Sequence, residues 1–347
     1  MINSNFWKDK KVLITGFSGF KGFWLNLILS KLGSDVHGIS KKEISSEIFN
    51  LYNNIQQSDN NNFIDLKDSE NLLLYLNKLN PDIIFHLAAQ SLVITSKLKP
   101  KSTIETNVIG SFNILDWVQK SEKNITTVVA TTDKVYKYPE KNNVEDDPLG
   151  SFEFYGASKV ALENMIDAFN NDKNSVNKIS VVRSGNVLGG GDGGENRILT
   201  DIIKSINNKN NLTLRNPESV RPWQFILDSI GGYILVAQHH FENKTFDKFN
   251  LNSDELNEIS VLELSNKIIQ KFDSKISVNI KENKNLSESK ELRINSTKAK
   301  KVLSWNHFYN VDDIVENIYE WEKNKESKEI KSETSRQIDK YLDLFSQ

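Results

Sequence analysis

The chain has 347 residues, of which 38% are hydrophobic and 26% are charged. These proportions are typical of a folded protein with a sizeable core and exclude a mainly disordered chain. The net charge of -2 gives no general attraction to nucleic acid or anionic membranes, so an anionic ligand has to be held by local groups. The absence of cysteine excludes disulfides, cysteine nucleophiles and cysteine-bound zinc.

The five histidines show no spacing typical of a metal site, and we expect none. The first residues lack the apolar core of a signal peptide. No run approaches the length of about 18 apolar residues that a membrane helix requires. We therefore expect a cytoplasmic protein that binds no metal, nucleic acid or membrane.

Short apolar runs alternate with helical patterns through the first half of the chain. The run 11–15 leads into glycines and a segment with helical spacing at 19–32, and a second run follows at 36–39. The later apolar runs lie at 82–85, 125–130 and 179–182, and the later helical segments lie near 68–79, 101–121 and 155–171. This order predicts an α/β fold of Rossmann type, with helices on both faces of a doubly wound, mainly parallel sheet of about seven strands.

After about residue 184 the pattern changes to a glycine-rich loop, a helix and short strand-like pieces. We expect a dinucleotide-binding domain at 1–184 and a smaller mixed α/β domain over most of 185–325, with a discontinuous boundary. The segment 326–347 is dense in charged residues, and it is expected to be an exposed helix or a partly ordered tail. An apolar cluster lies near its end, at Tyr341, Leu342, Leu344 and Phe345.

Gly16, Gly19 and Gly22 stand between the first predicted strand and the first predicted helix. Glycines allow a tight turn and a close approach to a pyrophosphate, and the helix N-terminus offers free N–H groups and a positive dipole end. This setting predicts a dinucleotide site. The alternative is a glycine-rich turn used only for packing.

Ser40, Lys41 and Lys42 follow the second predicted strand, where NAD-binding proteins usually have an acidic residue. A hydroxyl followed by two cations suits the 2′-phosphate of NADP, and a solvated basic loop is the alternative. Asp65 follows a third short apolar run and is a candidate for binding the adenine amino group.

Tyr155 and Lys159 form a YxxxK pair one turn apart on a predicted helix. A cation beside a phenol favours the phenolate, which can take a proton from a hydroxyl while hydride leaves the same carbon. Thr132, Asp133 and Lys134 follow a predicted strand, at the end where doubly wound folds bind ligands. They are candidates for orientation, general acid and general base, and a polar loop is the alternative.

Several motifs in this order resemble the extended short-chain dehydrogenases/reductases that act on sugar nucleotides. They are the GxxGxxG turn at 16–22, HLAAQ at 86–90, TNVIG at 106–110 and YxxxK at 155–159. Other motifs resemble specifically the 4,6-dehydratases of this group that act on CDP-glucose. These motifs are Phe6-Trp7, GFKG at 19–22, TDK at 132–134, RSGNVLGGGD at 183–192, LRNP at 214–217 and RPWQ at 221–224.

The resemblance implies NAD as the cofactor, whereas the Ser40-Lys-Lys42 loop leaves NADP open. The cofactor contacts that we expect are Gly16, Ser18, Gly19, Phe20, Gly22, Ser40, Lys41, Asp65, Leu66, Ala88, Ala89, Gln90, Asn107, Tyr155 and Lys159. The resemblance also implies that the nucleotide or its diphosphate contacts Asn186, Arg197, Arg215 and Arg221. A Val-Arg pair that usually follows HLAAQ in the family is replaced here by Val93-Ile94.

The implied reaction begins when Tyr155 deprotonates the C4 hydroxyl of the sugar while hydride passes to the nicotinamide. Lys134 then removes the C5 proton, Asp133 protonates the departing C6 hydroxyl, and the hydride returns to C6. Three alternatives remain open at this point. They are a 4-epimerase, a dehydratase that acts on another nucleotide sugar, and a catalytically silent nucleotide-binding regulator.

The resemblance also implies a homodimer that packs the helices near 101–121 and 155–171 against their counterparts. The first of these helices carries apolar residues whose spacing can serve both the core and a partner. They are Ile104, Val108, Phe112, Leu115 and Val118.

Overall fold

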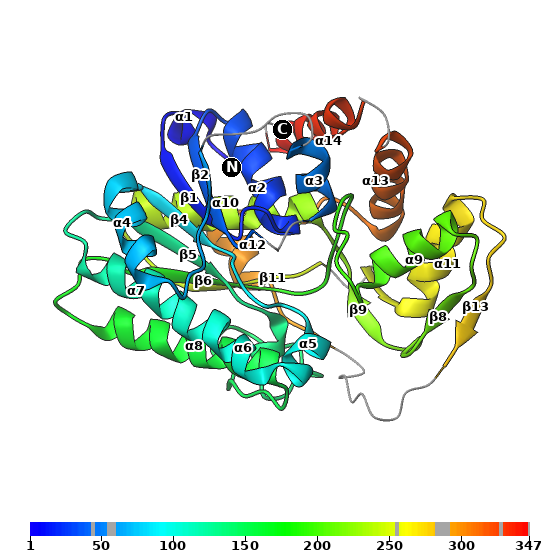
Figure 1. Cartoon of the computed structure of the whole chain (residues 1–347), viewed down its shortest axis with the longest axis horizontal. Helices are drawn as coiled ribbons and strands as arrows, with labels where there is room; N and C mark the ends of the chain where they lie inside the picture. Colours follow the sequence, from blue (N-terminus) through cyan, green and yellow to red (C-terminus); the bar gives the residue numbers. More distant parts are fainter. Residues whose placement is uncertain (43–45, 54–59, 254–256, 282–291, 326–328, 346–347) are drawn as a thin grey trace.

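The computed structural model describes residues 1–42, 46–53, 60–253, 257–281, 292–325 and 329–345. A seven-stranded parallel sheet with the order β11-β6-β5-β4-β1-β2-β3 lies at its centre (Figure 1). The strands are β1 (Lys11–Thr15), β2 (Asp35–Ser40), β3 (Asn61–Phe63), β4 (Ile83–His86), β5 (Thr126–Ala130), β6 (Ile179–Ser184) and β11 (Lys248–Leu251). The predicted Rossmann-type sheet of about seven strands is confirmed.

Successive side chains of the strands enter two different cores, as the pleat of a strand requires. Val12 and Ile14 of β1 belong to one core, and Leu13 belongs to the other. The helices packed in the first core include α1 (Ser4–Trp7), α2 (Phe20–Lys31), α3 (Glu47–Asn53) and α10 (Ile226–Asn243). Those packed in the second core are α4 (Ser69–Leu79), α7 (Ser111–Lys120) and α8 (Phe154–Asn171).

Strand β1 pairs with β2 on one side and with β4 on the other. The order of the strands therefore reverses between β1 and β4, which is the switch point where doubly wound sheets bind ligands outside the carboxyl ends. The loops that follow β1, β4 and β5 all open at this edge of the sheet.

The helix expected near 101–121 is built from three consecutive pieces. They are α6 (Pro100–Ile104), a π-helical segment η1 (Glu105–Gly110) and α7. Before them, α5 (Val93–Leu98) follows the loop after β4. A π-helical turn is often found at functional sites, and η1 carries the buried Asn107, whose contacts are described below.

The chain after β6 forms several short strand pairs and also contributes a strand and helices to the main sheet. Two short strand pairs form beside α9 (Ile198–Asn207) and α11 (Val261–Lys271), on the right of Figure 1, and a third packs against α10. The paired strands are β7 (Val187–Leu188) with β10 (Gln224–Phe225), β8 (Leu212–Leu214) with β13 (Val278–Ile280), and β9 (Val220–Pro222) with β12 (Glu258–Ser260). In contrast, α10 and β11 return to the main sheet, and α12 (Thr297–Leu303) packs beside β11.

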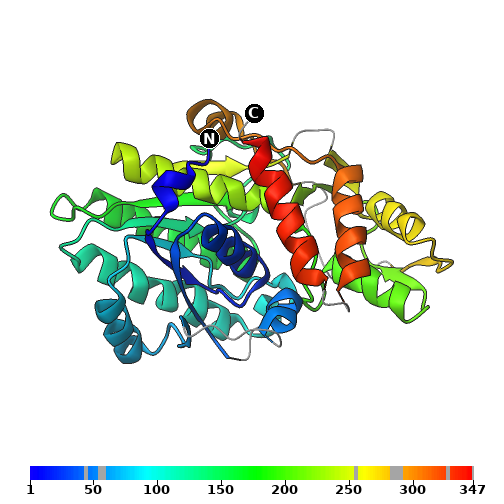
Figure 2. The same ribbon diagram turned by 90° about the horizontal axis from the view of Figure 1, so that it is seen from above.

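The C-terminal segment is a helix with a buried face, so the expectation of an exposed helix or partly ordered tail was wrong. Helix α14 (Ile330–Leu344) lies beside α13 (Val311–Asn324), as Figure 2 shows. Tyr341 is fully buried and lies so close to α10 that a Cβ on Gly231 would come within 1.9 Å of its hydroxyl. The many charges of this segment misled the prediction because most of them occupy the outer face, while apolar residues recur on one side of the helix.

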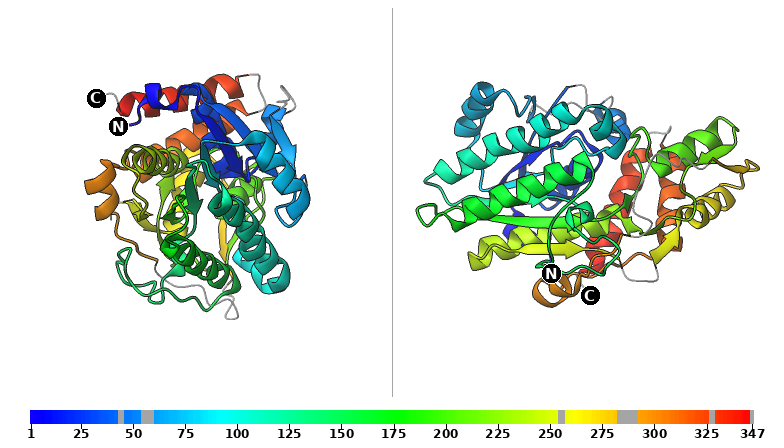
Figure 3. Two further views of the ribbon diagram at one scale, coloured as in Figure 1. Left: turned by 90° about the vertical axis from the view of Figure 1, so that its left-hand side faces the viewer. Right: turned by 90° about the horizontal axis from the view of Figure 1, so that it is seen from below.

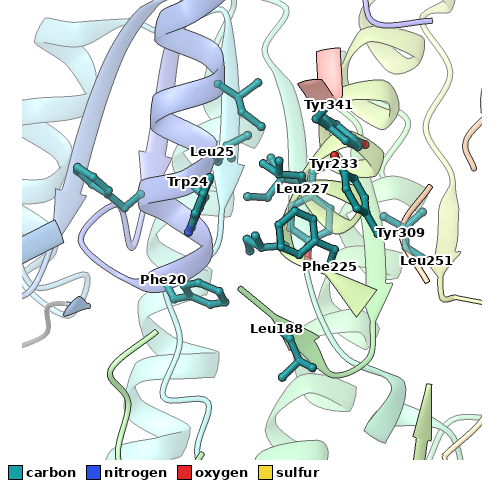
Figure 4. Close-up of a cluster of buried hydrophobic side chains, with 14 of the residues drawn as sticks. Phe20, Trp24, Leu25, Leu188, Phe225, Leu227, Tyr233, Leu251, Tyr309 and Tyr341 are labelled. Carbon is teal, nitrogen blue, oxygen red and sulfur yellow. The ribbon is translucent and has the colours of Figure 1, made fainter. Parts of the chain in front are cut away.

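Figure 4 shows the part of the first core where α2, α10 and α14 meet, behind the glycine turn. Trp24 of α2 donates a hydrogen bond from its indole N–H to the carbonyl of Gly190 at 3.0 Å. A Cβ on Gly190 would come within 2.1 Å of the ring of Trp321. Gly190 therefore lies between two tryptophans, and this contact holds the glycine-rich loop after β7 against the core. No helix of the described ranges is both long and apolar enough to span a membrane.

Candidate active site

A cavity of about 1080 Å³ runs along the carboxyl ends of the central strands. The glycine turn between β1 and α2 forms one wall. Gly16 has a φ of 74°, and a Cβ there would lie 2.9 Å from the backbone of Ala88. A Cβ on Gly22 would lie 2.2 Å from the carbonyl of Gly16. Only glycine fits at these two positions, and the turn leaves the first N–H groups of α2 available to a pyrophosphate.

The loops after β2 and β3 line the cavity beside the glycine turn. The hydroxyls of Ser18 and Ser40 share a hydrogen bond of 2.7 Å. Lys41 forms an ion pair of 3.0 Å with Asp65. Burial raises the pKa of Asp65, but hydrogen bonds from the backbone N–H of Lys67 and from Lys41, together with the charges of both lysines, lower it overall. The charge of Lys41 is therefore compensated by an ionised carboxylate.

Most residues expected to bind the cofactor line this cavity. They are Gly16, Ser18, Gly19, Phe20, Gly22, Ser40, Lys41, Asp65, Leu66, Ala88, Ala89, Tyr155 and Lys159.

Gln90 and Asn107 lie beside the cavity and not on its lining, and their contact with the cofactor stays a prediction. The amide of Asn107 accepts the N–H of Gln90 at 2.7 Å and donates to the Gln90 carbonyl and the Ser158 hydroxyl at 3.0 and 2.9 Å. The side chain of Gln90 bonds with Leu92 and Thr103. Because these groups are already paired, the two residues hold the cavity wall against α8.

His86 at the end of β4 orients Asn107 from the other side. The Ser111 hydroxyl donates to the Asn107 carbonyl at 2.8 Å, so it accepts from Nε2 of His86 at 2.8 Å. Nδ1 of His86 then accepts from the Thr15 hydroxyl at 2.8 Å. Burial, together with the charge of Lys159, lowers the pKa of His86 to about 3. This histidine is a neutral connector between β1, β4 and η1, and it does not act as an acid or base near neutral pH.

Tyr155 and Lys159 lie in the first two turns of α8 and both line the cavity. Burial raises the pKa of the Tyr155 hydroxyl well above its ordinary value, and a hydrogen bond with Thr132 offsets part of this effect. Lys159 donates to the Ala130 carbonyl at 3.0 Å. Burial lowers the pKa of Lys159 to about 8, while Glu163 raises it and Lys21 lowers it further.

Thr132, Asp133 and Lys134 follow β5, and a 3-10 turn over Asp133–Val135 presents them to the same cavity. The Thr132 hydroxyl donates to Oδ1 of Asp133 at 2.9 Å, and Lys134 Nζ lies 3.6 Å from that oxygen. The other oxygen of Asp133 is buried and has no hydrogen-bond partner among the described residues. Buried polar atoms are rarely left unpaired, so this oxygen is available to a ligand hydroxyl. Gly185 lies next to this oxygen, because a Cβ on residue 185 would come within 3.1 Å of it. The missing side chain leaves space for the ligand hydroxyl.

The four residues expected to contact the substrate nucleotide also line the cavity. They are Asn186, Arg197, Arg215 and Arg221. Arg197 joins two parts of the cavity wall. One terminal nitrogen donates to Asp192 at 3.1 Å, and the other donates to Ser91 at 3.2 Å. Guanidinium groups suit phosphate oxygens because they donate paired hydrogen bonds. Although the whole chain is slightly acidic, this part of the cavity can hold an anionic diphosphate.

Two buried residues of the site were not predicted from the sequence. Glu163 and Arg183 form an ion pair of 2.5 Å behind Lys159. The sequence nevertheless contains one indication of a role for each of these residues. Glu163 follows Lys159 by four residues, so it lies on the same face of α8, and Arg183 ends an otherwise apolar strand.

A glycine cradle for a dinucleotide, a YxxxK pair and a cavity at the switch point of a Rossmann-type sheet define a short-chain dehydrogenase/reductase. Comparison with known proteins narrows this class. The family model described as GDP-mannose 4,6 dehydratase matches residues 13–318, and the chain belongs to this family of nucleotide-sugar dehydratases.

One curated relative is the CDP-glucose 4,6-dehydratase of Salmonella typhimurium, which is 32% identical over 338 residues and is matched over 93% of each chain. Solved structures share the fold. An epimerase from Methanothermobacter thermautotrophicus matches with a TM-score of 0.82 at 22% identity, covering 93% of this chain and 95% of its own. A UDP-glucuronic acid 4-epimerase from Bacillus cereus, in complex with UDP-glucuronic acid and NAD, matches with a TM-score of 0.74 at 20% identity, covering 90% and 99%.

Proposed function

We propose that this protein is an NAD-dependent sugar-nucleotide 4,6-dehydratase that converts CDP-glucose to CDP-4-keto-6-deoxyglucose. The observation that carries the proposal is the pair Asp133 and Lys134 in the same cavity as Tyr155. A 4-epimerase needs only the oxidation at C4, whereas elimination of water needs an additional acid and base. The Salmonella relative supports CDP-glucose as the substrate.

The cavity fits a nicotinamide dinucleotide, because the turn at Gly16 and Gly22 has no space for side chains and exposes the start of α2. NAD is favoured over NADP, since Lys41 is paired with Asp65 and its charge is not free for a 2′-phosphate. The bound cofactor supplies the hydride acceptor for C4 and the hydride donor for C6. Ser18, Ser40 and Asp65 are placed to contact its adenosine half.

Tyr155 takes the proton of the C4 hydroxyl as hydride leaves C4. We infer that the positive charge of Lys159, one turn further along α8, favours the phenolate. A hydrogen bond with Thr132 also lowers the pKa of the Tyr155 hydroxyl in part. The 4-ketone that results makes the C5 proton acidic. Burial is the largest effect that opposes ionisation of Tyr155, and the proposal assigns to Lys159 a charge that offsets it.

Lys134 in its neutral form removes the C5 proton, and Asp133 in its protonated form donates to the C6 oxygen, which leaves as water. The unpaired oxygen of Asp133 is the one suited to this contact. When hydride returns to C6, Lys134 gives its proton back to C5, and the proton held by Tyr155 balances the one lost by Asp133. The net change in the sugar is the loss of one water molecule.

The segment 185–325 mainly binds the nucleotide in this proposal, because Arg197, Arg215 and Arg221 all come from it. Val93 and Ile94 line the sugar end of the cavity, where a cation is usual in the family. The sugar is therefore held there by packing and by the catalytic hydroxyls and amines.

Incubating the purified protein with CDP-glucose and NAD tests the function directly. We expect a 4-keto product that absorbs in strong alkali, and a mass lower than that of the substrate by one water. Parallel reactions with UDP-glucose and GDP-mannose examine the choice of nucleotide. Formation of CDP-galactose without loss of water would identify a 4-epimerase, and no conversion of any of these sugars would refute an enzymatic role on them.

We also propose a homodimer formed through α7, η1 and α8, which lie side by side on one face of the molecule (Figure 3). Ile104, Ile109 and Phe112 are 37%, 52% and 41% exposed on this face. Leu115 and Val118 are fully buried and belong to the core instead. An exposed apolar group of this kind is typical of an interface.

Light scattering at micromolar protein is expected to give a mass twice the 39.7 kDa of one chain. Ile109→Glu is expected to shift the protein to monomer, because it places a charge in the apolar face. Val302→Glu is the control, since Val302 is 45% exposed on α12, which packs in the first core on the other face of the sheet. A monomeric wild-type protein, or equal masses for the two variants, would contradict the proposed interface.

A further inference from the structure

The buried ion pair of Glu163 and Arg183 lies between the two parts of the chain that carry the catalytic groups. Arg183 of β6 donates to Glu163 of α8 through Nε at 3.0 and 3.1 Å and through Nη2 at 2.5 Å. Both side chains are almost completely inaccessible to solvent, at 1% and 0% exposure. Burying two charges costs free energy that their attraction only partly offsets, so such a pair is weak support for stability by itself. Its contacts with the catalytic groups point to another role.

Residues 131–136, which we call the catalytic segment, are attached to this ion pair at both ends. At one end, the Thr131 hydroxyl donates to Oε1 of Glu163 at 2.7 Å. At the other end, Nη1 of Arg183 donates to the Tyr136 hydroxyl at 2.7 Å, and its guanidinium lies over the Tyr136 ring. Asp133 and Lys134 lie between these two points, so the ion pair sets where they stand relative to α8.

Tyr136 is a neutral member of this network. Burial raises the pKa of its hydroxyl to about 12, while the charge and hydrogen bond of Arg183 oppose that rise. It therefore keeps its proton and donates it to Asn250 of β11 at 2.7 Å. Arg183 also donates to the carbonyl of Glu145 at 2.8 Å. The contact between Tyr136 and Arg183 is thus held by Asn250 of the sheet on one side and by the loop that contains Glu145 on the other.

The same carboxylate acts on Lys159. Glu163 lies one turn after Lys159 on α8, and its negative charge favours the charged form of the lysine against the effect of burial. Lys21 of α2 opposes it, and His86 of β4 is neutral. Arg183 of β6 is paired with Glu163, and Asp133 faces Lys134. Among these groups, Glu163 is the one whose negative charge supports a cationic Lys159.

We propose that Glu163 is a positioning residue for the dehydratase reaction. Its carboxylate keeps Lys159 cationic beside Tyr155 and, through Thr131 and Arg183, holds both ends of the catalytic segment against α8. This inference rests on the proposed roles of Tyr155 and Lys159. It adds that one buried carboxylate serves both the oxidation at C4 and the elimination at C5 and C6.

The first test is the pH dependence of kcat for CDP-glucose in Glu163→Gln and Glu163→Asp. Turnover of the wild type is expected to fall as the pH rises through about 8, where Lys159 loses its proton. Glu163→Gln removes the negative charge, so the fall is expected about one pH unit lower. Glu163→Asp keeps the charge and is expected to keep the wild-type position of the fall. An unchanged profile in Glu163→Gln would overturn the proposal.

Because removal of a buried charge can prevent folding, the second test uses Thr131→Val, which leaves the ion pair intact. It is expected to lower kcat about tenfold with little change in KM, since it releases one end of the catalytic segment. The matched control is Thr127→Val in β5, the strand that Thr131 follows, because Thr127 is fully buried and its hydroxyl has no hydrogen-bond partner among the described residues. Equal kcat in these two variants would also overturn the proposal.

A third measurement separates this inference from the proposed substrate. The rate at which acetic anhydride modifies Lys159 in the free enzyme, followed by peptide mass spectrometry over a range of pH, reports the charge of the lysine without turnover. In Glu163→Gln, the pH at which the modification rate rises is expected to shift to lower values by the same amount as the fall in kcat. A wild-type protein that does not convert CDP-glucose would refute the proposed function, whereas equal modification profiles would refute the role of Glu163.

Discussion

Tyr155→Phe is expected to lower kcat for CDP-glucose by about a thousandfold, the range that a positioned acid or base contributes. The reason is the loss of the ionisable oxygen that takes the C4 proton. The ring is 8% exposed, so phenylalanine fills the same space. Affinity for CDP-glucose is expected to stay close to that of the wild type. Steady-state kinetics and titration calorimetry with CDP-glucose measure the two quantities.

Tyr309→Phe is the control for this substitution. Tyr309 is 3% exposed, and its hydroxyl has no hydrogen-bond partner in the described part of the chain. It lies outside the cavity lining, so its removal is expected to leave kcat unchanged. If Tyr155→Phe retained wild-type activity, another group would have to act as the base at C4.

Lys134→Ala has the second large effect, because Lys134 separates elimination from simple oxidation. The C4 step is expected to persist in this variant, since Tyr155 and Lys159 remain. The C5 proton then has no base, so oxidised sugar and reduced nicotinamide accumulate in a single turnover. Near-ultraviolet absorbance measures the reduced cofactor, and mass spectrometry measures exchange of solvent deuterium into C5. Little exchange and a slow appearance of product are expected.

Lys134→Arg distinguishes a base from a fixed positive charge. A guanidinium keeps the charge but is not deprotonated at ordinary pH, so it cannot remove the C5 proton. This variant is therefore expected to behave like Lys134→Ala in the exchange experiment. Normal C5 exchange in either variant would move the search for the base to another residue of the cavity.

The central strands could be predicted because each is a continuous apolar run bounded by polar residues. The runs at 11–15, 36–39 and 179–182 correspond to β1, β2 and β6, with differences of at most two residues at an end. Strand β11 was missed because its sequence, Lys-Phe-Asn-Leu, is not an apolar run, and its pairing with β6 is decided by contacts far away in the sequence. The same holds for α14, whose burial depends on the shape of α10 and α13 rather than on its own composition.

Candidate catalytic residues that share one cavity could be recognised where they lie close together in the sequence. Tyr155 and Lys159 are one helical turn apart, and Thr132, Asp133 and Lys134 are consecutive. The sequence could not show that the side chains of Gln90 and Asn107 pair with protein groups, because their partners lie on other elements. It also could not show that Glu163 meets Arg183, because a helix and a strand have to pack before the two side chains can pair.

The position of β11 determines the order in which the sheet can be completed during synthesis. Strand β6 pairs with β5, which is made before it, and with β11, which is made only after a long intervening segment. Until Lys248–Leu251 has left the ribosome, β6 is an unprotected edge with free N–H and carbonyl groups, which invites association between chains. Arg183 lies on that edge strand, and its buried charge needs Glu163 as soon as β6 folds. The nascent protein therefore benefits from early docking of α8, before the last strand arrives.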